Sequence, residues 1–202
     1  PLDNIVVITG PCHAEEVAKE KLSYLTIASK SINNANTVAS YIGCRYIQTK
    51  VSDDIYGTEY SAVLKNIFAI ACGISHGLGY GDNYQAVLIS NAIQEIERFV
   101  AAVHPIKRDI KGSAYLGDLM VTTYSQFSRN RTFGMMIGRG YTPKIAQLEM
   151  NMIAEGYYAV KSIHAINQNY KVQMPIAEAV YRIIYEKSPA LEEFNKLSMI
   201  IS

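Results

Sequence analysis

The chain has 202 residues, of which 49% are hydrophobic and 18% charged, a composition typical of a globular protein with a large core. Nineteen basic and eighteen acidic residues leave a net charge of +1, too little positive charge to predict nucleic acid as a partner. Three cysteines without a C-x-x-C pair predict no disulfide framework, and the longest strongly apolar run, 67–74, is too short for a membrane span, so we expect a cytoplasmic protein.

The first part of the chain alternates short β-branched runs with short helical patterns. This alternation is typical of an α/β sheet, and it is followed by no further strand signal after Gly57. Because the chain begins with Pro1 and runs almost directly into a strand, we expect it to be a fragment that contains only the end of such a sheet. The predicted strands are 5–9, 23–28 and 46–51, and the predicted helices are 13–19 and 33–41.

The remainder of the chain predicts an all-α domain. Long segments show the apolar periodicity of amphipathic or buried helices. Glycines punctuate this part of the chain, namely Gly112, Gly117, Gly134, Gly138 and Gly140. The predicted helices are 58–75, 83–103, 131–139, 143–168, 174–187 and 190–199.

Lys65 is the first candidate catalytic residue. It lies in the segment AVLKNIFAI, in which apolar residues cover nearly every face of the predicted helix. A buried lysine readily gives and takes protons, because burial disfavours the charged ammonium form. The alternative is a lysine whose charged end reaches the surface from a core helix.

A second group of polar residues follows the long helices. Asp118 and Thr122 are four residues apart and would share one face if their segment is helical. Ser128, Arg129 and Asn130 then offer a hydroxyl, a guanidinium and an amide just before a predicted helix, which is suitable for holding a phosphate. The alternative is an exposed polar loop with a serine N-cap.

The segment GPCHAEE, residues 10–16, stands at a predicted strand-to-helix junction. Gly10 would allow close approach of a ligand to the backbone, although a tight turn explains it nearly as well. Cys12 would be a reactive thiol only with a nearby base, and the sequence shows none. The four histidines show no spacing typical of metal ligands, so we predict no metal site.

Taken in order, these motifs resemble the bacterial NAD(P)-dependent glycerol-3-phosphate dehydrogenase family. The resemblance extends essentially from end to end, except that the glycine-rich dinucleotide fingerprint with which the family begins is absent. It implies that residues 1–56 form the C-terminal part of a Rossmann-type nucleotide-binding domain and residues 57–202 a complete helical substrate-binding domain. The matching motifs are GPCHAEE (10–16), LKN (64–66), GLGYG (77–81), GDL (117–119), SRNRTFG (128–134), EG (155–156) and MPI (174–176).

The resemblance also implies roles for individual residues. Lys65 would be the proton acceptor and Asp118 its substrate-binding partner. Cys12 occupies a position where serine or threonine is more usual, so its hydrogen bond would be weak. The implied substrate contacts are Gly10, Cys12, Lys65, Asp118, Thr122, Ser128, Arg129 and Asn130, and the implied contacts to NAD or NADP are Ala14, Arg129 and Glu155.

The implied reaction interconverts sn-glycerol 3-phosphate and dihydroxyacetone phosphate by hydride transfer, and its product would feed phospholipid synthesis. Two alternatives remain at this stage: a helical protein-interaction module without catalysis, and a related dehydrogenase of 2-hydroxy or 3-hydroxy acids. A phosphate bound among Ser128, Arg129 and Asn130 would favour the phosphorylated substrate over the hydroxy acid of the second alternative. The sequence decides neither between NAD and NADP nor whether the chain forms a homo-oligomer.

Overall fold

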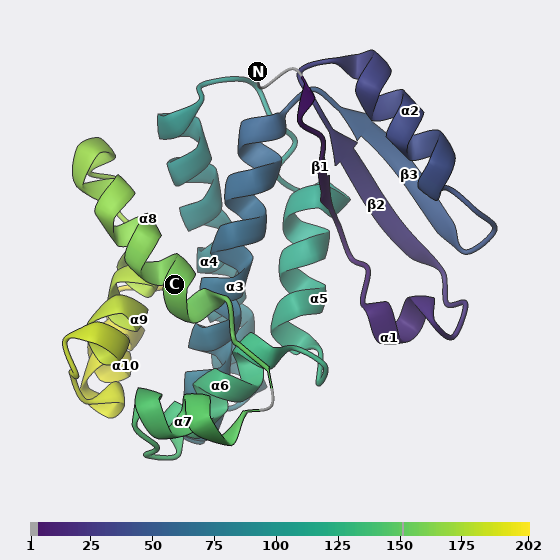
Figure 1. Cartoon of the computed structure of the whole chain (residues 1–202). Coiled ribbons are helices and arrows are strands. Elements are labelled where there is room, and N and C mark those ends of the chain that lie inside the picture. The colour runs from purple at the N-terminus through teal and green to yellow at the C-terminus, as the bar shows by residue number, and fades with distance from the viewer. Residues whose placement is uncertain (1–3, 151) are drawn as a thin grey trace.

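A computed structural model describes residues 4–150 and 152–202 and shows a small sheet unit beside a larger helical unit (Figure 1). The order of elements confirms the predicted class, an α/β segment followed by an all-α segment. The sheet unit contains β1 (Val7–Thr9), α1 (Ala14–Val17), β2 (Ser23–Ala28), α2 (Ile32–Ile42) and β3 (Ile47–Ser52).

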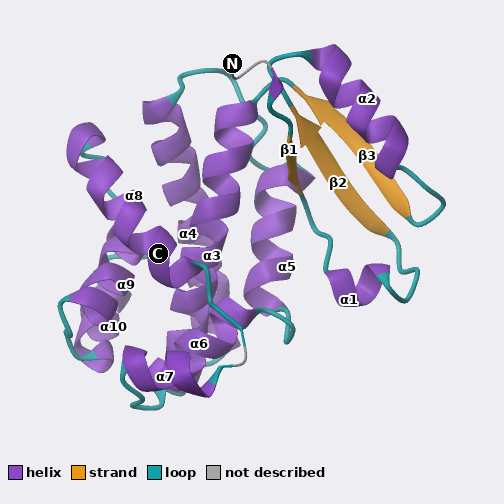
Figure 2. Ribbon diagram, in the orientation of Figure 1, coloured by secondary structure: helices purple, strands orange, loops and turns teal. Residues whose placement is uncertain are grey.

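The sheet has three strands in the order β1-β2-β3. β1 pairs antiparallel to β2, with Thr9 opposite Thr26, and β2 pairs parallel to β3. Helix α2 covers one face of the sheet (Figure 2), where Ile27, Ala35 and Ala39 form a small apolar core. Helix α1 is shorter than the predicted 13–19, since the chain turns at Glu20 with a positive φ of 55°.

The helical unit is organised around α3, a 23-residue helix that packs against α4, α5, α6, α8 and α9. Most of the large apolar side chains are buried around it, as the apolar pattern of 58–75 predicts. Among the described residues no helix combines the length and hydropathy needed to span a membrane. The helices are α3 (Ile55–Gly77), α4 (Asp82–Val103), the π-helix η2 (Ser113–Gly117), α5 (Asp118–Tyr124), α6 (Arg129–Gly138), α7 (Pro143–Glu149), α8 (Gly156–Tyr170), α9 (Pro175–Tyr185) and α10 (Ala190–Ser198).

Two of the glycines in the predicted helix 131–139 lie inside α6, as predicted. Gly134 and Gly138 belong to α6, where they face α3. A Cβ atom at Gly134 would lie 2.1 Å from the carbonyl oxygen of Ile70, and one at Gly138 would lie 2.3 Å from that of Ile74. Their role is therefore to allow α6 to pack with its backbone against α3.

The predicted single helix over 143–168 is wrong, because α7 ends at Glu149 and α8 begins at Gly156. Met150 has an extended backbone that interrupts the helical periodicity. At Gly156 the chain approaches α3 so closely that a Cβ atom would lie 2.7 Å from the carbonyl oxygen of Asn66. Local periodicity does not encode this packing against α3, which accompanies the break.

Glu95 is a fully buried carboxylate that joins α4 to α9. Its Oε1 accepts a hydrogen bond from the backbone N–H of Ile176 at 2.6 Å, and its Oε2 accepts one from that of Ala177 at 3.2 Å. The carboxylate thus satisfies two free N–H groups at the first turn of α9. Burial raises the pKa of Glu95 to about 8, against the opposing effect of these two hydrogen bonds.

This raised pKa predicts that the chain loses stability as the pH rises. Below about pH 4.5 Glu95 is protonated in both the folded and unfolded states, whereas between pH 4.5 and 8 only the folded state keeps the proton. The free energy of unfolding should therefore fall through this range by on the order of 1.4 kcal/mol per pH unit at the steepest point. Urea denaturation at several pH values measures it. The Glu95→Gln variant should lack this pH dependence of the free energy of unfolding. If its free energy of unfolding fell with pH as steeply as that of the unmodified chain, the prediction would be contradicted.

Candidate active site

Lys65 and Asp118 form an ion pair between two helices. Lys65 lies on α3, and Asp118 begins α5. The Nζ atom of Lys65 lies 2.7 Å from Oδ1 and 2.6 Å from Oδ2 of Asp118. Asp118 is almost fully buried, while 19% of the lysine side chain is exposed. The amine is therefore held by a buried carboxylate and belongs to a side chain that is partly exposed to solvent.

The sheet unit contributes two further hydrogen bonds to the same carboxylate. Thr9 ends β1, and its hydroxyl donates to Oδ2 of Asp118 at 2.8 Å. The backbone N–H of Gly10 donates to the same oxygen at 3.2 Å. Gly10 has a φ of 133°, and a Cβ atom there would lie 2.4 Å from the carbonyl oxygen of Tyr24, so only glycine fits this turn.

Sequence reasoning identified Gly10 but missed Thr9. A threonine at the end of a strand is common in sheets, and its contact with Asp118 spans 109 positions of the chain. Only its place directly before Gly10 at the predicted strand-to-helix junction could have drawn attention to it.

Cys12 lies two residues beyond Gly10 and is partly buried. Burial raises the pKa of its thiol, and the nearby Asp118 carboxylate raises it further. These effects disfavour the thiolate form that a reactive thiol at Cys12 would need. A neutral thiol remains a weak hydrogen-bond donor at this position.

Thr122, Ser128 and Asn130 are buried, and each makes a hydrogen bond within the fold. The segment of Asp118 and Thr122 is helical, and the Thr122 hydroxyl donates to the carbonyl oxygen of Asp118 at 2.7 Å. The Ser128 hydroxyl accepts from the backbone N–H of Arg131 and so caps α6, as the alternative interpretation of this loop predicts. The side-chain oxygen of Asn130 accepts from the backbone N–H of Gly156 at 2.9 Å. The Asn130 NH₂ group keeps its two donors for other partners.

Arg129 and Glu155 line a cavity of about 690 Å³ at the start of α6 and α8. Arg129 is exposed and donates to the carbonyl oxygen of Ile153 at 3.3 Å. The neighbours of these residues, Asn130 and Gly156, contact each other, and Gly156 also packs against Asn66 beside Lys65. One end of the cavity lining is thus joined to α3 at Asn66, the residue after Lys65. The remaining lining residues are Gln147, Met150, Met152, Ile153, Ala154 and Tyr158.

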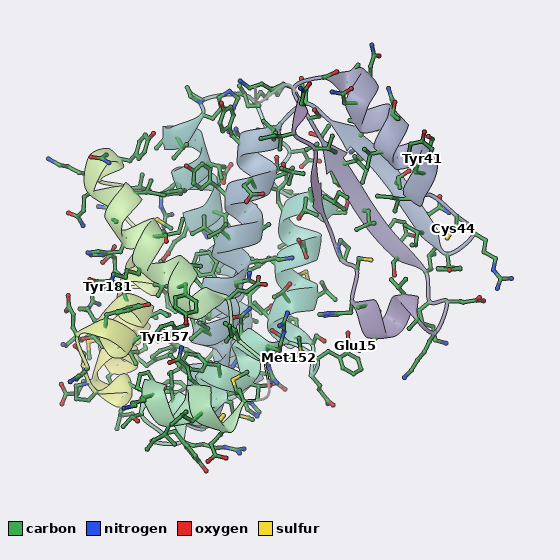
Figure 3. All side chains as sticks on the ribbon, in the orientation of Figure 1. Glu15, Tyr41, Cys44, Met152, Tyr157 and Tyr181 are labelled. Carbon is green, nitrogen blue, oxygen red and sulfur yellow. The ribbon has the colours of Figure 1, made fainter. Side chains whose placement is uncertain are left out.

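Ala14 does not line this cavity but lies on another element. It is the first residue of α1 in the sheet unit and is exposed. The residue before it, His13, makes an edge-on ring contact with Phe127, two residues before Arg129, with 6.1 Å between the ring centroids. In Figure 3, Glu15 of α1 and Met152 of the cavity lining both lie toward the sheet side of Tyr157 and Tyr181. The predicted cofactor contacts therefore come from two elements: Arg129 and Glu155 share one cavity, and Ala14 belongs to α1.

Known proteins resemble this chain in both sequence and structure. A family model described as the C-terminus of NAD-dependent glycerol-3-phosphate dehydrogenase matches residues 54–195. A glycerol-3-phosphate dehydrogenase [NAD(P)+] of Thermotoga sp. (strain RQ2) is 39% identical over 191 residues, which cover 95% of this chain and 59% of the relative. One of Agathobacter rectalis is 37% identical over 199 residues, which cover 98% of this chain and 59% of the relative.

The crystal structure of glycerol-3-phosphate dehydrogenase from Coxiella burnetii superimposes with a TM-score of 0.92 at 33% sequence identity. The match covers 95% of this chain and 59% of the Coxiella chain. The present chain thus spans less than two thirds of the length of these relatives, and the matched part includes both the sheet unit and the helical unit.

The contact between Thr9 and Asp118 predicts a measurable loss of stability when the hydroxyl is removed. The Thr9→Val variant keeps a β-branched side chain but leaves Asp118 without one donor. Because this hydrogen bond goes to a charged acceptor, its loss should lower the free energy of unfolding by about 1.5–3 kcal/mol. Denaturant unfolding at neutral pH measures the difference. The Thr9→Ser variant keeps the hydroxyl and should retain most of the stability; equal losses in both variants would show that packing of the methyl group, and not the hydrogen bond, matters.

Proposed function

The chain belongs to the NAD-dependent glycerol-3-phosphate dehydrogenase family, and we propose that it supplies the substrate-binding and proton-transfer groups for the interconversion of sn-glycerol 3-phosphate and dihydroxyacetone phosphate. The observation that carries this proposal is the Lys65–Asp118 ion pair, on a helix that also contacts the turn between Glu155 and α8 through Asn66. A protein-interaction module would need neither a buried ion pair nor a polar cavity. The family membership likewise favours a phosphorylated substrate over a 2-hydroxy or 3-hydroxy acid.

The cavity of Arg129 and Glu155 has the chemistry to hold part of a nicotinamide cofactor. Met152 and Ile153 expose 61% and 62% of their surfaces there, which offers apolar area for a planar ring. Arg129 offers donors to a phosphate or an amide, and Glu155 offers an acceptor. Ala14 would contact the cofactor from the sheet side. When bound, NAD or NADP would supply or accept the hydride at C2 of the substrate.

Lys65 moves the proton in this proposal. Two of its three N–H donors are directed at the carboxylate of Asp118, which leaves one for the C2 oxygen of the substrate. In the direction of reduction the ammonium donates a proton to the carbonyl oxygen of dihydroxyacetone phosphate, and in the direction of oxidation the amine takes the hydroxyl proton. Asp118 holds the amine in place and balances its charge, and Thr9 and Gly10 hold Asp118.

Arg129 and the start of α6 bind the phosphate of the substrate in this proposal. The first N–H groups of a helix attract anions, and a guanidinium can contact two phosphate oxygens at once. Arg129 is the exposed cation of this turn, whereas Ser128 and Asn130 are buried and hold the turn in place. Binding of the phosphate would fix the distance between C2 and Lys65. Cys12 and Thr122 would add weaker contacts near Asp118.

Turnover should require more sequence than this chain contains. The relatives named above are longer, and the 59% that the chain matches carries no glycine-rich dinucleotide fingerprint. We therefore expect no dehydrogenase activity from the isolated chain. A chimera in which this chain replaces the matching part of the Thermotoga enzyme is expected to be active with dihydroxyacetone phosphate and a reduced cofactor. An active isolated chain would contradict this division of roles.

The role of Lys65 can be tested in that chimera. The Lys65→Ala variant removes the proton donor, and loss of a positioned acid or base lowers kcat by about 10²–10⁴-fold. The matched control is Lys144→Ala, which removes an exposed lysine of α7 and should leave kcat unchanged. A decrease of less than about tenfold for Lys65→Ala would assign Lys65 to packing and charge balance instead of proton transfer.

The role of Arg129 can be tested by a substitution that keeps the charge. In Arg129→Lys a single ammonium replaces the guanidinium, and losing one charge-assisted hydrogen bond should lower kcat/KM for dihydroxyacetone phosphate by roughly 10- to 150-fold. The measurement requires saturating cofactor, because Arg129 also borders the proposed cofactor site. Arg139→Lys, at the other end of α6, is the control.

The comparison substrate for Arg129→Lys is dihydroxyacetone, which lacks the phosphate. Because the arginine has no phosphate to hold there, kcat/KM should change little. Equal decreases for dihydroxyacetone and dihydroxyacetone phosphate would place Arg129 outside the phosphate site.

A further inference from the structure

Asp54 is a buried carboxylate outside the proposed site, and donors from three segments of the chain converge on it. The backbone N–H of Gly57 donates to its Oδ1 at 3.0 Å, so that Asp54 caps the start of α3. The guanidinium of Arg108 donates to Oδ1 through Nη2 at 2.9 Å and to Oδ2 through Nε. The hydroxyl of Tyr115 donates to Oδ2.

The contacts around Asp54 leave no space for a side chain at Gly57, in the first turn of α3. A Cβ atom at Gly57 would lie 2.1 Å from Oδ2 of Asp54 and 2.5 Å from Nε of Arg108. Arg108 also donates to the carbonyl oxygen of His104 at 2.6 Å, which fixes it to the end of α4. Burial opposes the negative charge of Asp54, but the hydrogen bonds from Arg108 and Tyr115 lower its pKa below the ordinary value.

Tyr115 connects this cluster to the proposed catalytic pair. It belongs to the π-helix η2, which ends where α5 begins with Asp118. The backbone N–H of Asp118 donates to the carbonyl oxygen of Tyr115 and to that of Ser113. The residue whose hydroxyl is bound by Asp54 therefore also accepts the backbone hydrogen bond of Asp118.

Asp54 and Lys65 are joined by two separate series of covalent and hydrogen-bonded links. From Asp54 one path runs through Tyr115 to the backbone of Asp118, and from its carboxylate to Lys65. The other path runs directly along α3, on which Lys65 follows Asp54 by eleven residues, or about three helical turns. The hydrogen bond between Asp54 and Tyr115 thus adds a polar contact, besides the ion pair itself, that joins η2 and the start of α5 to the helix of Lys65.

We propose that Asp54, acting through Tyr115, is a positioning residue for the Lys65–Asp118 pair. It does not reach the substrate. It sets where η2 lies along α3, and so where the carboxylate of Asp118 meets the amine of Lys65. The catalytic meaning of this placement rests on the proposed function, but the placement itself is a property of the chain without substrate or cofactor.

The test is a nitrogen-15 NMR measurement on the isolated chain. The ammonium signal of Lys65, assigned by its loss in Lys65→Met, reports how firmly Asp118 holds the amine through the exchange of its protons with water. In Tyr115→Phe, which keeps the ring but removes the hydroxyl, this exchange should become several-fold faster. In Asp54→Asn it should also become faster, and if that variant does not fold, Tyr115→Phe alone decides.

Tyr185→Phe is the matched control. It removes a hydroxyl that donates to the carbonyl oxygen of Tyr157 at 2.7 Å, on the side of the helical unit far from the sheet (Figure 3). It should lower the melting temperature about as much as Tyr115→Phe but leave the Lys65 exchange rate unchanged. If Tyr115→Phe lowers the melting temperature and leaves the Lys65 signal as in the unmodified chain, Asp54 is only structural and the proposal is wrong. The NMR measurement needs no turnover, so a failure of this proposal can be told apart from a failure of the proposed function, which an inactive chimera would indicate.

Discussion

The ion pair of Lys65 and Asp118 is the interaction on which the arrangement of the molecule depends. A buried carboxylate is unfavourable unless it is paired and hydrogen-bonded, and Asp118 meets this requirement with donors from both units of the fold. The end of β1 supplies Thr9 and Gly10, and α3 supplies Lys65. The same contacts that stabilise the buried charge also join the sheet to the helices. Removing the Asp118 carboxylate would therefore weaken both the proposed catalytic pair and the junction between the two units.

Helix α3 can occupy the centre because its neighbours approach it closely. Gly134 and Gly138 of α6 bring two helix backbones into contact, and Gly156 brings the start of α8 against Asn66. These approaches set how closely the helices that begin at Arg129 and just after Glu155 lie against α3. A larger residue at any of these glycines would move α6 or α8 away from α3, because atoms in a packed interior have little space to adjust.

Much of this organisation could be predicted from the sequence. Apolar periodicity located α3 and α4, and β-branched runs located β2. The spacing of Asp118 and Thr122 gave a shared face on condition that their segment is helical, which α5 fulfils. What the sequence did not reveal depends on contacts between distant segments: the hydroxyl of Thr9 on Asp118, the break before Gly156 and the packing role of Gly134. Periodicity reports which face of an element is buried but not what lies against it.

The central claim is that Lys65, held by Asp118, exchanges a proton with the C2 oxygen of a phosphorylated three-carbon substrate. A crystal structure of the active chimera with bound dihydroxyacetone phosphate tests it most directly. The account predicts the carbonyl oxygen within hydrogen-bond reach of Nζ of Lys65, about 2.6–3.2 Å, and the phosphate at Arg129 and the start of α6. A phosphate bound elsewhere, or a carbonyl oxygen too far from Lys65 for a direct or water-mediated hydrogen bond, would contradict it.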